Sequence, residues 1–403
     1  MDRYDVAIVG AGVIGMSVAL ALKESGLSIA LIDAASAPAS EPSGRGVDGW
    51  GKRVTALTPA SEEFLGSLDA WSAMHRTDRV ASYTDMQVWD GEASGAIHFA
   101  ASDVGAMALG HIAESQLTMS VLAELVAVAP AIHNRWSARV VGCTSDAEGV
   151  ELDCDNGSSI RAELVIAADG ARSNIRDLAA MRTRQWRYQQ NAIVATVELE
   201  QDHRDTCWQA FLATGPLALL PLAESNHCSI VWSLDDDVSQ RWEAASDAEF
   251  VDGLNRALSA VPMRVTAVGE RATFPLVQCH AVDYVKDRIV LVGDAAHSIH
   301  PLAGQGINLG LADAKVLAES IINAIQRGGP WASAPVLGRY QRLRKTENLA
   351  MMAAMQAFKW GFGSRNPTAV MARNFGLRMV DEQRWIKNWF AKQAALSLIH
   401  ISE

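Results

Sequence analysis

The sequence has few cysteines and no long run of basic residues. Its five cysteines, among 403 residues, lie far apart and form no Cys-x-x-Cys pair, which excludes a zinc site or redox disulfide of that type. Their odd number and wide spacing predict a reducing, cytoplasmic compartment. The formal net charge is -11 and there is no basic stripe, so nucleic-acid binding is not expected and small molecules are the expected partners. No metal site is expected either.

An uncharged stretch near the N-terminus, from Val6 to Leu22, contains three closely spaced glycines. Residues 6–9 are typical of a buried parallel strand, and the glycines open a predicted helix that runs to about Lys23. Residues 28–32 form the next predicted strand. A signal peptide or a membrane span would also be uncharged, but the glycine spacing and the early strand fit neither well.

The three glycines have the spacing of a dinucleotide-binding turn. Gly10 makes the tight turn, Gly12 lets the backbone approach a pyrophosphate, and Gly15 allows close packing of helix and strand. The pyrophosphate would lie at the helix N-terminus, where unpaired N–H groups attract negative charge. Asp33, which ends the second apolar run, is expected to accept a hydrogen bond from a ribose hydroxyl. FAD and NAD both fit this pattern.

Two later segments again place an acidic residue and a glycine after an apolar run. Asp169 and Gly170 follow the first run, and Gly293 and Asp294 follow the second. Open α/β sheets bind ligands at the carboxyl ends of their strands, so Asp294 is expected to contact a ribityl hydroxyl. A Gly-Gln-Gly sequence at 304–306 then opens a predicted helix, whose free N–H groups would face the negative charge of a reduced flavin.

The rest of the chain predicts a mixture of helices and antiparallel strands, without internal repeats. Residues 34–51 are rich in Ala, Ser, Pro and Gly and predict a long mobile loop. Inside it, residues 44–49 match the glycine pattern with no strand before them, which predicts a flexible surface loop. Helices are predicted at 61–68, 115–128 and from 306 onward; strands are predicted at 139–144, 149–154, 159–162, 193–199, 208–212, 218–222 and 229–234.

Taken together, the three motifs resemble those of the FAD-dependent aromatic hydroxylases of the para-hydroxybenzoate hydroxylase fold. Within that family the chain is most similar to the ubiquinone-biosynthesis hydroxylases. Shorter matches occur at 53–57, 110–114, 211–222, 231–234, 274–276 and 373–377, and the resemblance extends from Tyr4 to about Ala395. The expected fold is therefore α/β, with a Rossmann-like FAD-binding domain (1–70, 106–180 and 275–330) and an interleaved antiparallel-sheet substrate domain (71–105 and 181–274). A C-terminal helical region (331–396) and an unassigned tail (397–403) complete the chain.

The resemblance implies a role for each motif residue. It assigns the adenosine and pyrophosphate of FAD to Gly10, Gly12, Gly15, Asp33 and Arg53, and the ribityl-pyrophosphate region to Gly293 and Asp294. It links Asp169, Gly170 and Arg172 to both FAD and the nicotinamide donor, and it places Pro301, Gly304, Gly306, Ile307 and Asn308 beside the isoalloxazine ring. His297 would lie near that ring or serve as a structural histidine, and it is not expected to act as a general base; nor is His300. Glu114 lies where members of the family vary, so the resemblance assigns it no role.

The implied reaction is a ring hydroxylation. NADPH or NADH reduces FAD, O2 adds to form a C4a-hydroperoxide, and the distal oxygen passes to a phenol carrying an isoprenoid tail on the way to ubiquinone. Such a tail would need membrane access. Trp360, Trp385, Trp389 and Phe390, with nearby Arg and Lys residues, are interpreted either as core or as a peripheral contact with the inner membrane.

Other functions share the same motifs. An epoxidase, a halogenase or a prenyl reductase would bind FAD in the same way, although a Trp-x-Trp-x-Ile-Pro string that would favour a halogenase is missing. A non-catalytic flavoprotein that serves as a scaffold in a biosynthetic complex is a third interpretation. Neither the hydroxylated ring carbon nor the choice between NADPH and NADH follows from the sequence.

Overall fold

The computed structural model describes residues 1–38, 42–91, 96–259, 262–298 and 305–363, and the following description is confined to them. A largely parallel eight-stranded sheet carries the dinucleotide motif. Its strands are β1 (Asp2–Val9), β2 (Ile29–Ile32), β8 (Ile132–Arg135), β9 (Val140–Ser145), β10 (Val150–Cys154), β11 (Ser159–Ala167), β18 (Val285–Lys286) and β19 (Ile289–Leu291). The order is β18-β19-β11-β1-β2-β8, and β9 and β10 extend it beside β11.

The central strands of this sheet all run in the same direction. β1 pairs in parallel with both β2 and β11, and β11 pairs in parallel with β19. Val9 lies opposite Ile32 and Ala167, and Ala167 lies opposite Leu291. Strands buried on both faces need apolar side chains throughout, which is why these segments read as continuous apolar runs. The four carboxyl ends consequently meet at one edge of the sheet.

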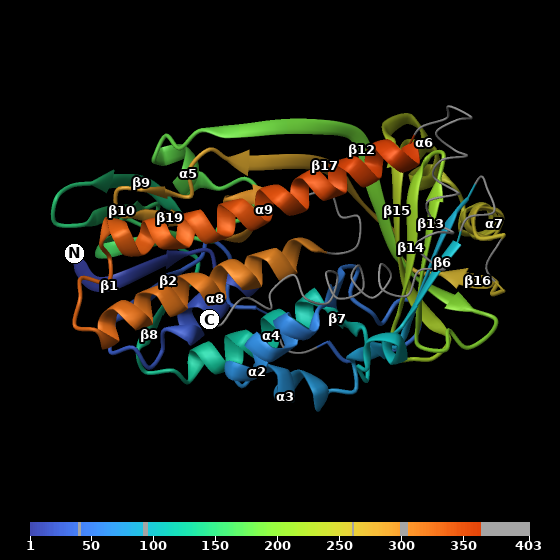
Figure 1. Cartoon of the computed structure of the whole chain (residues 1–403), viewed down its shortest axis with the longest axis horizontal. Coiled ribbons are helices and arrows are strands. Elements are labelled where there is room, and N and C mark those ends of the chain that lie inside the picture. Colours follow the sequence, from blue (N-terminus) through green and yellow to red (C-terminus); the bar gives the residue numbers. More distant parts are fainter. Residues whose placement is uncertain (39–41, 92–95, 260–261, 299–304, 364–403) are drawn as a thin grey trace.

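Helices pack beside this sheet and beside one another. They are α1 (Val13–Ala21), α2 (Pro59–Ser67), α3 (Ala70–His75), α4 (Ser115–Ala127), α5 (Asn174–Leu178), α8 (Gln305–Gln326) and α9 (Ala334–Gly363). α1 packs against α4 and α8, and α9 packs along α8. Figure 1 shows α8 and α9 side by side, with the first turn of α8 pointing toward the other end of the molecule.

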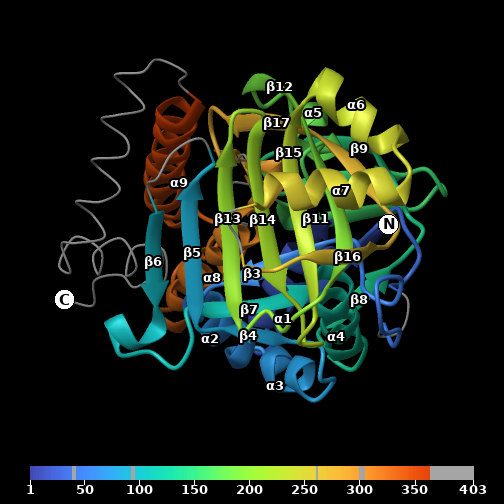
Figure 2. The same cartoon turned by 90° about the vertical axis from the view of Figure 1, so that its right-hand side faces the viewer.

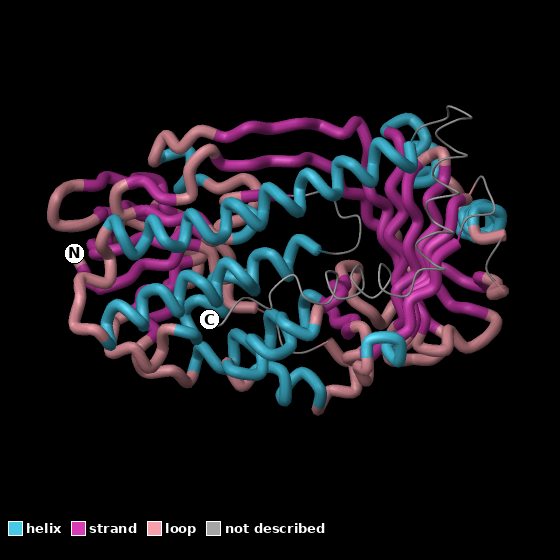
Figure 3. The backbone as a smooth tube through the Cα atoms, viewed as in Figure 1, coloured by secondary structure: helices cyan, strands magenta, loops and turns pink. Residues whose placement is uncertain are grey.

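A nine-stranded sheet forms that other end. It contains β5 (Asp85–Asp90), β6 (Ala96–Ala100), β12 (Thr183–Leu199), β13 (Thr206–Leu212), β14 (Gly215–Pro221), β15 (His227–Asp235), β16 (Val265–Val268), β17 (Ala272–Ala281) and β20 (His297–Ser298). α6 (Asp236–Ala244) and α7 (Asp247–Ala257) lie against its outer face, where Trp232 and Phe250 share a core (Figure 2). Figure 3 shows these strands gathered at one end of the molecule, and β12 and β17 extending back over the helices.

Most elements confirm the sequence-based predictions, with differences at long strands. Residues 159–162 were predicted as a short strand separate from the apolar run before Asp169, but they form one strand, β11, which joins the antiparallel meander to the parallel sheet. β12 begins ten residues earlier than predicted because its first half pairs with β17 alone. The nine-stranded sheet is not wholly antiparallel, since β5 pairs in parallel with β13.

Residues 44–49, predicted as a flexible surface loop, form a loop, but distant side chains hold it and the residues up to Gly51 against the rest of the protein. This segment lies against a three-stranded sheet of β3 (Val54–Leu57), β7 (Gly110–Glu114) and β4 (Ala81–Tyr83). Arg79 donates hydrogen bonds to the carbonyls of Gly44 and Gly49, and Glu224 accepts hydrogen bonds from the Gly46 N–H at 2.9 Å and the Trp50 indole at 2.7 Å. Its partners are far away in the sequence, so the local composition carried no sign of them.

Candidate active site

The glycine turn after β1 forms an open cradle at the start of α1. Gly10 has a φ of 102°, and a Cβ there would lie 2.4 Å from the Ala168 carbonyl oxygen, so only glycine fits. A Cβ on Gly15 would lie 1.8 Å from the Gly10 oxygen, whereas a Cβ on Gly12 would meet nothing within 4 Å. α1 has no side-chain cap and no acidic residue in its first turn, so its N–H groups are available to an anion.

The parallel sheet brings the other acidic motif residues to the same edge. Asp33 follows β2, and its carboxylate accepts hydrogen bonds from Ala11 N–H at 2.6 Å and Ala35 N–H at 2.7 Å. Asp169 follows β11, and its Oδ2 accepts a hydrogen bond from Ile175 N–H at 3.1 Å. The other oxygen, Asp169 Oδ1, is buried and has no hydrogen-bond partner within the described chain. An unpartnered buried carboxylate oxygen is costly, so it indicates a missing donor such as a ligand hydroxyl.

Asp294 lies where the third strand of this group, β19, is followed by a short 3-10 turn at Gly293–Ala295. Its side chain is exposed, yet surrounding protein raises the pKa of its carboxyl by desolvation, against the opposite effect of His297 and Arg53. A group that solvent can reach but that protein surrounds on most sides is well placed to meet a bound molecule. Arg53 is also exposed, and its guanidinium carbon lies 5.9 Å from the centre of the Phe274 ring.

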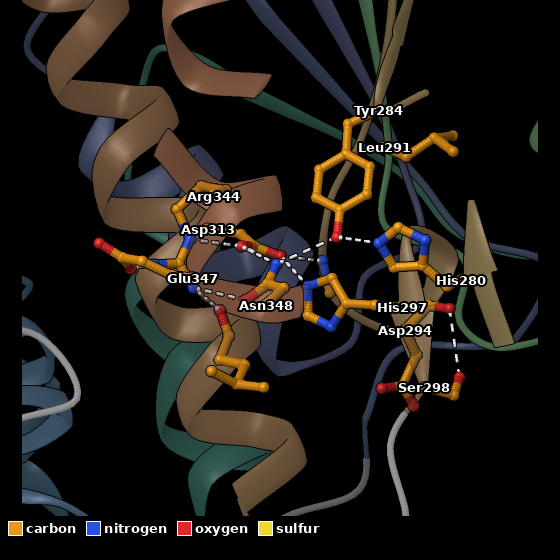
Figure 4. A network of polar contacts seen from close by, with 12 residues as sticks. His280, Tyr284, Leu291, Asp294, His297, Ser298, Asp313, Arg344, Glu347 and Asn348 are labelled. Atoms are coloured by element: carbon orange, nitrogen blue, oxygen red, sulfur yellow. Dashed lines mark hydrogen bonds and ion pairs between the residues drawn. The ribbon is translucent and has the colours of Figure 1, made fainter. Parts of the chain in front are cut away.

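A buried polar network lies behind the Asp294 turn (Figure 4). Asp313 Oδ2 accepts hydrogen bonds from the Gly293 N–H at 2.9 Å and from His297 Nε2 at 2.6 Å, while its Oδ1 lies 2.7 Å from Arg344 Nε. Asp313 and Arg344 are completely buried. Burial alone would raise the pKa of Asp313, but His297 and Arg344 lower it to about 2. His297 is 1 % exposed and its Nε2 is bonded to the buried Asp313, which favours the structural interpretation of this histidine.

Arg176, in α5, connects the Asp169 motif to the same turn. It is 2 % exposed, and its guanidinium donates hydrogen bonds to Ala295 O at 3.0 Å and Ala171 O at 3.1 Å. Arg172, which the family resemblance links to FAD and the nicotinamide donor, is instead exposed. The second and third motifs are therefore joined by a buried arginine four residues after the predicted one.

The first turn of α8 begins as predicted, but one of its residues has a structural role. Asn308 is completely buried; its Oδ1 accepts hydrogen bonds from Ser61 Oγ at 2.7 Å and Thr58 N–H at 3.1 Å, and its Nδ2 donates one to Ala56 O at 2.8 Å. Gly306 has open space around its missing Cβ, and Ile307 is half-buried. Pro301, Gly304 and His300 lie outside the described residues.

Comparison with known proteins identifies the cofactor of this chain. A family model described as an FAD binding domain matches residues 3–354. The chain belongs to the FAD-dependent aromatic hydroxylases. The residues present also fit FAD: an open cradle at Gly12, an uncapped helix N-terminus for the pyrophosphate, and an unpartnered carboxylate oxygen on Asp169. FAD is the cofactor, and the chain is a monooxygenase that takes electrons from NADPH or NADH.

Two hydroxylases and one solved structure illustrate the likeness. The chain is 34% identical to the 3-demethoxyubiquinol 3-hydroxylase of Escherichia coli (strain K12), over 97% of this chain and 98% of that one. It is also 34% identical to the ubiquinone hydroxylase UbiL of Rhodospirillum rubrum, over 97% and 89% of the two chains. The fold matches the crystal structure of p-nitrophenol 4-monooxygenase PnpA from Pseudomonas putida DLL-E4 with a TM-score of 0.77 at 20% identity, over 98% and 99% of the chains.

Several buried charged residues at and near this candidate site could not be assigned a role from the sequence. The sequence offers one indication that Asp313 is buried and paired, because it is an acidic residue inside an apolar stretch of α8. Nothing in the sequence distinguishes Arg344, because it lies among several other basic residues of α9. Glu114, which the resemblance left without a role, forms a buried ion pair with Arg79, at 2.6 Å between Oε2 and Nε. Within the described chain, no group of three or more His, Cys, Asp or Glu side chains is placed to bind a metal ion.

Proposed function

We propose that this hydroxylase adds oxygen to the ring of a polyprenylated phenol in ubiquinone biosynthesis, using NADPH or NADH and O2. The observation that carries the proposal is the 34% identity to the 3-demethoxyubiquinol 3-hydroxylase, which extends over almost the whole of both chains. A match confined to the cofactor motifs would support FAD binding alone. This match also includes the nine-stranded sheet, which lies outside the three cofactor motifs.

In this proposal the edge of the parallel sheet binds the cofactor. The N–H groups at the start of α1 and the space at Gly12 receive the pyrophosphate, Asp33 contacts the adenosine end, and Arg53 is a further contact of the phosphates. Asp169, Gly170 and Arg172 border the FAD and the nicotinamide donor, and Asp294 accepts a hydrogen bond from the ribityl chain. Residues 301–304 and the start of α8 border the flavin ring.

The substrate ring would lie between the first turn of α8 and the inner face of the nine-stranded sheet. Figure 1 shows that this turn points toward that sheet, and α6 and α7 cover the opposite face. Bound FAD supplies the activation of O2 once it has been reduced. The protein orients the ring, excludes water, and provides the N–H groups of α8 to stabilise negative charge on the reduced flavin.

Quinone profiling in a strain that lacks the corresponding gene tests the proposal. The deletion strain should accumulate a prenylated intermediate that lacks one ring hydroxyl and should make less ubiquinone. Reintroducing the intact gene should restore the profile, and a Gly12→Val gene should not. Normal ubiquinone and no such intermediate in the deletion strain would refute the proposed substrate. Oxygen-dependent consumption of NADPH or NADH by the purified protein separates an enzyme from a non-catalytic flavoprotein.

The remaining proposals concern membrane access, partners and domain boundaries. A substrate with an isoprenoid tail would require contact with the inner membrane, and Trp385, Trp389 and Phe390 are the proposed contact; they lie outside the described residues. No helix in the described part of the chain is long and apolar enough to cross a bilayer. Membership in a biosynthetic complex and the proposed division into FAD-binding, substrate and C-terminal regions stay predictions.

A further inference from the structure

A single oxygen atom contacts both ends of the turn that presents Asp294. Asp313 Oδ2 accepts a hydrogen bond from the Gly293 N–H, at the first residue of the turn, and another from His297 Nε2, four residues later. Between them, the Ala296 N–H donates to Gly293 O at 2.9 Å, and Gly293 has a φ of 58°. Gly293 and His297 are buried, whereas the Asp294 side chain is exposed. Hydrogen bonds to the buried Asp313 therefore hold this turn on its inner side, and the turn presents the Asp294 carboxylate to solvent.

The second oxygen of Asp313 has a different set of partners. Its Oδ1 accepts hydrogen bonds from Arg344 Nε at 2.7 Å and from Asn348 Nδ2 at 3.3 Å. Arg344 also donates to Asn348 Oδ1 at 3.0 Å and to Leu309 O at 3.3 Å, and both Arg344 and Asn348 are completely buried. One oxygen therefore faces the turn, and the other faces a cation supplied by α9. These two functions of one carboxylate can be separated by mutation.

We propose that Asp313 is a positioning residue for FAD, because its Oδ2 holds residues 293–297 in the conformation that binds the cofactor. Arg344 keeps the buried Asp313 ionised and contributes to folding, not to cofactor affinity. This inference rests on the proposed assignment of the Asp294 turn to the cofactor. It adds a residue of α8 that no motif includes and that acts from behind the site.

The alternative is a purely structural ion pair. A buried pair whose partner is removed destabilises the fold, and FAD would then be lost only because the protein unfolds. Single substitutions of Asp313 cannot distinguish the two cases, since each removes the buried anion beside Arg344 and leaves its charge only the ion pair with the partly exposed Glu347. The test therefore removes that charge in every variant and changes only the acceptor oxygen.

The experiment compares two double variants of the full chain, each with Arg344→Gln. In Asp313→Asn/Arg344→Gln, the amide oxygen can replace Oδ2 and accept from Gly293 and His297, while the amide NH2 faces the side-chain carbonyl of the glutamine that replaces Arg344. In Asp313→Leu/Arg344→Gln, the side chain has similar size but no acceptor. FAD affinity is measured on the apoproteins by quenching of flavin fluorescence, and folding is measured by the melting temperature of each apoprotein.

We expect the Asn variant to bind FAD within about threefold of the wild type and the Leu variant to bind at least about thirtyfold more weakly, while the two apoproteins melt at similar temperatures. Equal FAD affinity in two folded variants would overturn the proposal. If the Leu variant does not fold, His297→Leu replaces it, because this substitution leaves the Asp313–Arg344 pair intact and removes one of the two hydrogen bonds to Oδ2. FAD binding by a folded His297→Leu protein should then be weaker, and wild-type affinity would overturn the proposal.

Asp294→Ala separates this inference from the assignment on which it rests. If Asp294→Ala binds FAD as tightly as the wild type while the Leu variant does not, the assignment of the Asp294 carboxylate fails and the positioning role of Asp313 stands. If Asp294→Ala weakens FAD binding and the two double variants bind alike, the site assignment stands and the role proposed for Asp313 is refuted.

Discussion

Arg79 and Glu114 form an ion pair that is almost entirely removed from solvent. Arg79 Nε lies 2.6 Å from Glu114 Oε2, and their side chains are 2% and 0% exposed. The guanidinium also lies over the Trp50 ring, at 4.2 Å from its centre, and Glu114 accepts a hydrogen bond from the Gly51 N–H. The pair therefore attaches the 44–51 segment to the three-stranded sheet.

Replacing Glu114 by Gln should strongly destabilise the protein. The substitution keeps the size of the side chain but leaves the Arg79 charge buried without an anion, which costs about 3–5 kcal/mol. Urea unfolding measures the loss. The matched control is Asp69→Asn, which removes the partner of Lys23 in an exposed pair at 3.2 Å and should cost less than about 1 kcal/mol. Equal effects of the two substitutions would contradict the importance of burial.

Gly12→Val should abolish FAD binding and leave the apoprotein folded. The backbone at Gly12 is extended, with φ -77° and ψ -175°, and its Cβ direction is open, so valine fits the protein but occupies the space proposed for the pyrophosphate. FAD affinity, measured by fluorescence titration, should fall at least about thirtyfold, or about 2 kcal/mol.

Gly15→Ala is the control for that result. Its Cβ would lie 1.8 Å from the Gly10 oxygen, so this smaller substitution should lower the melting temperature of the apoprotein, which Gly12→Val should not do. A folded Gly12→Val protein that stays fully yellow would refute the assignment of the glycine turn.

A negative charge in the first turn of α8 should make the flavin harder to reduce. Asn308→Asp is unsuitable, because it would remove the amide N–H that Asn308 donates to the Ala56 carbonyl in the core. Gln305→Glu adds the charge at the first residue of α8 without changing the size of the side chain. The two-electron potential should fall by roughly 10–20 mV, equivalent to about 0.5–1 kcal/mol.

Gln326→Glu places the same charge at the last residue of α8 and should leave the potential unchanged. Spectroelectrochemical titration measures both variants. A potential that rises in Gln305→Glu, or that falls equally in both variants, would show that the start of α8 does not face the flavin.

Protonation of His280 in the unfolded chain should make the protein less stable as the pH falls from about 6.5 to 4. Desolvation and the nearby His297, Lys345 and Arg184 lower its pKa to about 4, and its Nε2 lies 3.1 Å from the Tyr284 hydroxyl. A histidine whose pKa is lower in the folded state binds protons more readily when the chain is unfolded. Its full contribution to the free energy of unfolding is therefore present above pH 6.5 and is lost as the pH falls below that value. The lowered pKa of His280 corresponds to about 3 kcal/mol of the free energy of unfolding.

Urea unfolding of the wild type and His280→Gln at pH 7.5 and pH 4.5 tests this. The glutamine variant should lose less stability between the two pH values, because the proton uptake by the unfolded state has been removed. His111, whose pKa burial and His75 also lower to about 4, adds a similar dependence in both proteins and cancels in the difference. An identical loss in the two proteins would exclude His280 as a source.

The C-terminal tryptophans should contribute to membrane binding. Trp385 and Trp389 are four residues apart and are flanked by Arg384, Lys387 and Lys392, a pattern typical of a helix at a lipid surface. Replacing both tryptophans by serine should reduce co-sedimentation with anionic liposomes without changing FAD content or melting temperature. A large loss of thermal stability with unchanged liposome binding would instead assign them to the core.

The amino-acid sequence by itself determined the turns that follow the parallel strands of this protein. A strand that is buried on both faces must be apolar, a tight turn at positive φ requires glycine, and each of these signals is local. The motifs at Gly10, Asp169 and Asp294 could therefore be found in order along the chain, and the parallel pairing of their strands explains why they converge.

Only the tertiary structure decided which side chains support those turns. Asp313 meets Gly293 and Arg344, Arg176 meets Ala295, and Glu224 meets the 44–51 segment, across separations of 20 to 178 residues. A buried charge or donor needs a partner, but the sequence does not say which one, because that depends on the strands and helices that pack beside it. For the same reason, the loop at 44–51 looked flexible from its composition, yet distant side chains attach it to the folded structure.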